Sequence, residues 1–96
     1  MKMFIVVRKD LDSTYRMVQG AHALAEYMLK FPNEWNNGTI VFVVVKNIWS
    51  MVKTVQELEL SKECFATFHE PDLNDEATAI ACYSSGEMFK KLQLVK

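Results

Sequence analysis

Short, wholly apolar runs alternate with longer amphipathic stretches along this chain. The segment Lys2–Arg8 has an apolar centre without polar alternation, and Ile40–Val45 contains six apolar residues in succession. Strands of this kind are typical of a sheet that is covered on both faces. We therefore expect two buried strands here, the second at or beside the centre of the sheet, because an apolar edge strand would promote aggregation.

A helix is expected after each of these strands. The first begins among the capping residues of segment 10–14 and runs to about Phe31, where Pro32 ends it. Its apolar positions recur at helical spacing and predict one buried stripe: Met17, Ala21, Leu24, Met28 and Phe31. Asn47 can cap the second helix. The apolar face of that helix would consist of Ile48, Met51, Val52, Val55 and Leu58.

The rest of the chain predicts two strands and a short helix. Segments 63–69 and 77–83 favour strands, and the polar loop 71–75 between them is short enough for an antiparallel pair. Ser84 and Glu87 have the spacing of a capping box, which predicts a last helix. The predicted order is β-α-β-α-β-β-α, which indicates an α/β domain with three layers, α/β/α, around a mixed four-stranded sheet.

Composition narrows the class of protein. The 96 residues suffice for one domain, 1–96, and the net charge of −1 argues against DNA binding by bulk charge. No apolar run approaches the ~20 residues of a membrane span, so we expect no membrane partner. The start has no signal-peptide pattern, which predicts a cytoplasmic protein with reduced thiols. Cys64 and Cys82 are expected inside apolar strands as small buried residues.

Candidate chemistry gathers on the first helix. Tyr15, Gln19, His22 and Glu26 follow one another at spacings of four, three and four residues, which places them on one face. In open α/β sheets, sites form beyond the carboxyl ends of the parallel strands, where this helix would begin. The alternative for His22 is a structural histidine between the small residues of segment 20–23.

Metal and cofactor sites are not indicated. His22, His69, Glu70 and Asp72 lack the spacing of a zinc site, and we expect no metal. The chain has three glycines and neither a dinucleotide-binding nor a phosphate-binding glycine motif, so no cofactor is expected.

Several motifs, in order, resemble the type II peptidyl-tRNA hydrolases. Residues 3–11 join an apolar strand to Arg-x-Asp-Leu, and residues 19–23 read Gln-Gly-Ala-His-Ala. Trp35 and Gly38 then precede the second apolar strand, and a Leu-x-Leu segment lies near the end. The resemblance extends over nearly the whole chain. It implies hydrolysis of the ester between a peptide, or a blocked aminoacyl group, and tRNA.

Three positions depart from the family pattern. The family has a lysine seven residues before the histidine, where this chain has Tyr15, with Arg16 as the nearest cation. Glu70 takes the place of an aspartate at the end of the third strand, and the loop after it is shorter. Thr78 either corresponds to the family's threonine or is an ordinary strand residue.

The resemblance assigns roles to these residues. Ester hydrolysis needs a base for water, which Glu70 or Asp72 could supply, and donors for the oxyanion. The expected catalytic residues are Glu70, His22, Gln19 and Asp72. The expected substrate-binding residues are Arg8, Lys9, Arg16, Tyr15 and Thr78, with Arg8 and Lys9 on phosphates of the tRNA acceptor end.

A second interpretation stays open. In it, the chain is a non-catalytic binding module of the same fold that recognises a nucleotide, an RNA end or a protein. A homodimer is compatible with either interpretation.

Overall fold

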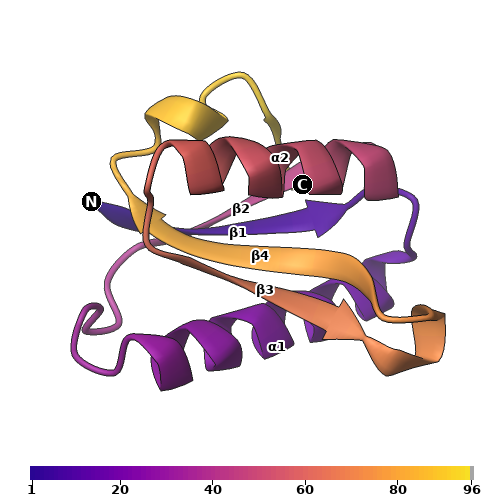
Figure 1. Ribbon diagram of the computed structural model, residues 1–96, viewed down its shortest axis with the longest axis horizontal. Helices are drawn as coiled ribbons and strands as arrows, with labels where there is room; N and C mark the ends of the chain where they lie inside the picture. The colour runs from indigo at the N-terminus through magenta and orange to yellow at the C-terminus, as the bar shows by residue number, and fades with distance from the viewer. Residues whose placement is uncertain (96) are drawn as a thin grey trace.

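The computed structural model describes residues 1–95 (Figure 1). Its elements are β1 (Lys2–Arg8), α1 (Ser13–Lys30), β2 (Ile40–Val45), α2 (Ile48–Leu60), β3 (Phe65–Glu70), β4 (Glu76–Ser84) and β5 (Gln93–Leu94). Two short 3-10 turns complete them, η1 (Pro71–Leu73) and η2 (Glu87–Phe89). Within the described part of the chain, neither helix has the length and apolarity that a bilayer crossing requires.

The sheet is mixed, with five strands in the order β3-β4-β1-β2-β5. The central strand β1 pairs in parallel with β2 and antiparallel with β4. Outer strands β3 and β5 pair antiparallel with β4 and β2. The prediction for segment 40–45 is confirmed, since β2 lies beside the central strand with Val43 and Val45 buried.

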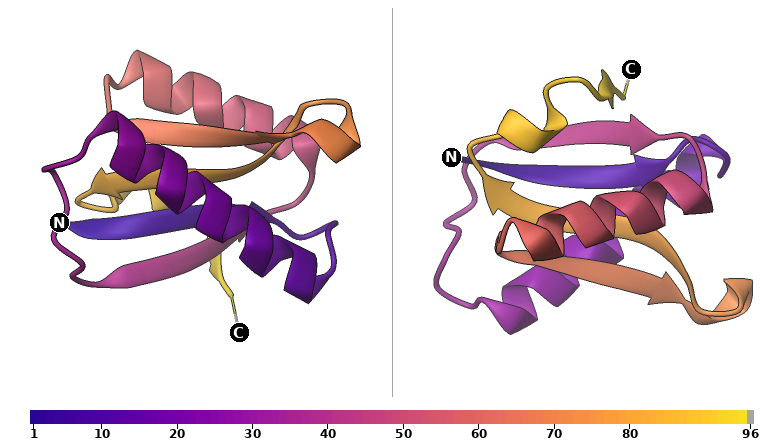
Figure 2. Two further views of the ribbon diagram at one scale, coloured as in Figure 1. Left: turned by 90° about the horizontal axis from the view of Figure 1, so that it is seen from below. Right: turned by 45° about the horizontal axis from the view of Figure 1, so that its top comes forward.

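One helix covers each face of the sheet (Figures 1 and 2). On one side Met3, Ile5 and Val7 of β1 pack with Ala23 and Tyr27 of α1. The intervening residues of β1 belong to the opposite core, in which Phe4 and Val6 join Met51 and Leu58 of α2. Because successive side chains of a strand point to opposite faces, the continuous apolar run of β1 supplies both cores.

The carboxyl-terminal segment corrects two predictions. The capping-box helix at Ser84 is wrong: the Ser84 hydroxyl accepts a hydrogen bond from the backbone N–H of Gly86 at 3.0 Å, and only the short turn η2 follows. Gly86 has φ +92°, which is outside the range of a right-handed helix, so no helix starts at Ser84. A Cβ at Gly86 would also collide with the ring of Phe4. It then forms β5 beside Val43 and Val44, which makes five strands rather than four.

The predicted apolar stripe of α1 is confirmed in part. Leu24, Met28 and Phe31 are half-buried and pack against the core, whereas Met17 is 56% exposed and Ala21 is exposed. The buried residues of α1 are Gln19, Gly20, Ala23 and Tyr27. The face that α1 turns to the sheet is therefore rotated from the predicted stripe in its first half.

The two cysteines lie in different environments. Cys82 is buried in β4, where burial raises the pKa of its thiol to about 12. Cys64 precedes β3 and is exposed, so its predicted burial inside a strand is wrong.

Gly20 sets how closely α1 approaches the sheet, and its replacement should be costly. A Cβ at this position would lie 2.8 Å from Cε2 of Phe42 and 3.0 Å from Cγ2 of Ile5. Overpacking costs ~1–3 kcal/mol, against a gain of ~1 kcal/mol in helix propensity. We expect Gly20→Ala to lower the free energy of unfolding by about 1 kcal/mol, as measured by urea denaturation.

Gly38→Ala is the matched control. A Cβ at Gly38 would meet only the indole nitrogen of Trp35, at an ordinary 3.9 Å. Its unfolding free energy should stay within ~0.5 kcal/mol of the unsubstituted protein. Equal effects of the two substitutions would contradict the close approach of α1.

Candidate functional site

The topology brings the first turns of α1 to the carboxyl ends of β1 and β3. Both β1 and β3 are antiparallel to β4, so they run in the same direction and end at the same edge of the sheet. In Figure 1 this is the right-hand edge, where α1 begins and η1 joins β3 to β4. The start of α1, which follows β1 directly, therefore meets the end of β3, which is distant in sequence.

The centre of the site is the side chain of Gln19, which is fully buried. Its amide nitrogen donates to Oε1 of Glu70 at 2.8 Å. Its amide oxygen accepts a hydrogen bond from the hydroxyl of Thr78. Both ends of the amide are thus satisfied, and they join α1 to β3 and β4.

Tyr15 and the turn η1 complete the surroundings of Glu70. The Tyr15 hydroxyl donates to Oε1 of Glu70 at 3.2 Å, and the backbone N–H of Asp72 donates to Oε2 at 3.4 Å. Pro71 follows Glu70, whose backbone is extended (φ −86°, ψ 115°), as expected for a residue before proline. The carboxylate is therefore held in one direction, with Oε2 the less occupied oxygen.

These donors determine the charge of the site. The hydrogen bond from Gln19 is the main cause that lowers the pKa of Glu70, assisted by the N–H of Asp72, by Tyr15 and by the charge of His22, while burial opposes them. Burial, followed by the charge of Glu70, raises the pKa of Tyr15. At neutral pH the site therefore holds an ionised carboxylate beside a protonated phenol.

His22 lies at the margin of this site. Its ring stacks on Phe68 of β3, with centroids 4.4 Å apart and planes 12° from parallel. It contributes positive charge near Glu70 and no hydrogen bond to it in the described structure. Of the predicted helix face, Tyr15, Gln19 and His22 contact residues of β3, and Glu26 is exposed.

The environment of Arg8 does not fit its predicted role, which is to contact phosphates of the tRNA acceptor end. It is buried, and it binds Asp10 through Nε at 3.0 Å and Nη2 at 2.8 Å. Its Nη1 binds Glu76 at 2.7 Å and the carbonyl of Ala77 at 3.3 Å. The guanidinium lowers the pKa of Asp10, chiefly through these hydrogen bonds. Arg8 thus joins β1 to β4, and its charge is already paired with the carboxylates of Asp10 and Glu76.

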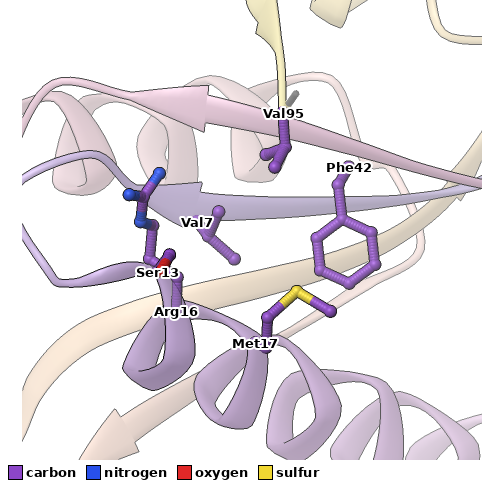
Figure 3. Close-up of a pocket in the computed structure, with 6 residues that line it drawn as sticks. All are labelled: Val7, Ser13, Arg16, Met17, Phe42 and Val95. Carbon is purple, nitrogen blue, oxygen red and sulfur yellow. The ribbon is translucent and has the colours of Figure 1, made fainter.

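Of the remaining predicted residues, Asp72 reaches Glu70 through its backbone N–H, while its side chain is exposed. Lys9 is exposed as well. Arg16 lies on the other flank of α1, where it lines a cavity together with Phe42 of β2 and Val95 (Figure 3). Among residues 1–95, no contact joins Arg16, a predicted substrate-binding residue, to Glu70. Glu76, the partner of Arg8, was missed because only strand pairing brings these two residues together.

Comparison with known protein families finds no family model that matches the chain, and comparison with curated proteins finds no significant relative. Over residues 1–95 no three His, Cys, Asp or Glu side chains gather in a way that could hold a metal ion. The interpretation of the site therefore depends on its own geometry.

Loss of the Gln19 amide should move the titration of Glu70. A folded-state pKa below the ordinary value of 4.5 adds stability at pH values above 4.5, and this stability is lost as the pH falls through the lower, folded-state value. We expect Gln19→Leu to raise the pKa of Glu70 towards 4.5, as measured by NMR titration of the side-chain carboxyl carbon.

Tyr15→Phe removes one of the lesser donors and should raise this pKa by a smaller amount. If Gln19→Leu left the pKa of Glu70 unchanged in a folded protein, the amide would not be the group that holds the carboxylate ionised.

Proposed function

We propose that this protein hydrolyses the ester between a peptide, or a blocked aminoacyl group, and tRNA, with Glu70 as the general base. The observation that carries the proposal is the Glu70 carboxylate. The buried amide of Gln19 holds its Oε1, and its Oε2 is largely unoccupied. The order of motifs that resemble the type II peptidyl-tRNA hydrolases supports the same reaction.

The proposed mechanism assigns a step to each group. A water bound to Oε2 of Glu70 loses its proton to the carboxylate as its oxygen attacks the ester carbonyl. The tetrahedral intermediate then collapses, the bond to the ribose oxygen breaks, and the proton passes from Glu70 to that oxygen. Gln19 and Tyr15 act as positioning residues, because both contact Glu70 through Oε1. A base with a lowered pKa is weak, so the expected turnover is slow.

One observation favours a second function, a binding module without catalysis. Among residues 1–95 no cationic side chain hydrogen-bonds or ion-pairs with Glu70, and a tyrosine occupies the position of the family's lysine. An ionised carboxylate that is not paired with a cationic side chain is suited to hold an ammonium or amide group of a ligand.

Glu70→Gln tests the first function. We expect the protein to release the blocked amino acid from acetylated aminoacyl-tRNA, and the substitution to lower kcat by about tenfold or more, the usual contribution of a general base. Asp75→Asn, on the outer loop, is the matched control, and His22→Ala should also lower activity by about tenfold or more. An equal rate for Glu70→Gln and the unsubstituted protein would contradict Glu70 as the base.

Tyr15→Lys separates the two functions. If the unsubstituted protein is inactive in this assay and Tyr15→Lys creates hydrolysis, the binding module is the correct interpretation. If the unsubstituted protein is active and Tyr15→Phe alters the pH profile of kcat, Tyr15 positions the base.

The dependence of tRNA binding on salt should be shallow. Arg8 is paired with two carboxylates, so Lys9 and Arg16 are the cations of the predicted set left for phosphates. At about 0.7–0.9 per phosphate, the slope of log affinity against log salt should be about −1 to −2. Affinity measured by filter binding between low and moderate salt checks this, and binding that is independent of salt would remove phosphate contacts from the proposal.

A further inference from the structure

A cavity of about 160 Å³ lies on the side of α1 that faces β2 and the carboxyl-terminal segment. The residues that line it are Val7, Ser13, Arg16, Met17, Phe42 and Val95. Figure 3 shows these side chains around a common central space, with Arg16 and Ser13 on one side and Phe42 on the other. Apolar walls with a few converging polar groups are typical of a site for a small molecule.

Among the described residues, Arg16 supplies the one charged group of this lining. The residue is half-buried, and its Nε is enclosed with no hydrogen-bond partner among residues 1–95. The terminal nitrogens of the guanidinium are not enclosed in this way, so an acceptor from a bound molecule would pair with Arg16 through them.

We propose that this cavity binds a small monocarboxylate with a short branched aliphatic body. A planar carboxylate can accept hydrogen bonds from the two terminal nitrogens of the Arg16 guanidinium. Its apolar body would pack between Met17, Phe42 and Val95, which form the apolar side of the cavity. Ser13 offers a further hydroxyl to the carboxylate end.

The charges nearby favour a monoanion over a phosphate dianion. Arg16 is the only cation among the described residues of the lining, and the carboxylate of Asp12 caps α1 next to Ser13, where it accepts from the backbone N–H of Tyr15 at 3.1 Å. A second negative charge would have no second cation of this lining to pair with. The carboxylate could belong to a free acid or to the end of a peptide, and both share this chemistry.

This inference shares Arg16 with the proposed phosphate contacts of tRNA, but it shares no residue with the proposed hydrolytic site. Glu70, Gln19 and Tyr15 are not among the residues that line the cavity. Binding in the cavity should therefore be unaffected by Glu70→Gln, and the two proposals can fail separately.

The test is an NMR titration of the folded protein with isocaproate. We expect a dissociation constant of about 1 mM or below, with the largest shifts at the amides of Val7, Phe42 and Val95. Isocaproamide, which has the same body without the charge, should bind at least about tenfold more weakly, as expected when a charged hydrogen bond is lost. Acetylleucine represents the carboxyl end of a peptide, and isocaproate represents a free acid. The acid with the lower dissociation constant identifies the source of the carboxylate.

Two substitutions make the test specific. Arg16→Gln should weaken isocaproate binding by about tenfold or more, whereas Lys9→Gln, an exposed cation outside the lining, should not. If Arg16→Gln fails to fold, Met17→Glu serves instead, because Met17 is on the surface and the new carboxylate would repel the ligand, with Met17→Gln as its neutral control.

The proposal is overturned by any of three results. These are no saturable shift with either acid, equal affinity for isocaproate and isocaproamide, and tighter binding of inorganic phosphate than of isocaproate. Retained affinity in a folded Arg16→Gln protein would likewise remove Arg16 as the anion-binding group.

Discussion

The amide of Gln19 is the interaction on which the arrangement of this edge depends. A fully buried amide must have both its donor and its acceptor paired, and here Glu70 and Thr78 provide the partners. The two bonds fix the rotation of α1 about its axis and its distance from β3 and β4. Since Gly20 follows directly, the turn of the helix that holds the amide is also the turn that approaches the sheet most closely.

The same constraint explains which features of the candidate site could be predicted. The helical spacing of Tyr15, Gln19 and His22 is a local property, and the position of Glu70 before Pro71 indicates the end of a strand. Both follow from the sequence. The burial of Gln19 does not, because a polar residue is expected on the exposed face until its partners on other strands are known.

Fold predictions succeeded where a pattern is local and failed where it depends on pairing. The ranges of the first four elements and the mixed sheet follow from apolar runs and capping residues. The fifth strand does not, because Gln93–Leu94 is too short to show a period and forms only against β2. Likewise the pattern placed Met17 and Ala21 on the buried face of α1, where Gln19 and Gly20 lie instead.

The pairing of β1 with β4 has a consequence for how the chain is made. Lys2 lies opposite Ser84 and Val7 opposite Ala79, so β1 leaves the ribosome well before its partner β4 has been made. Until then β1 can pair only with β2, through the parallel unit that α1 closes. During synthesis the other hydrogen-bonding edge of β1 is open to non-native partners, and such long-range pairing is slow. Seven acidic residues emerge in this interval, and their charge would help to keep the incomplete chain from associating with its copies: Glu57, Glu59, Glu63, Glu70, Asp72, Asp75 and Glu76.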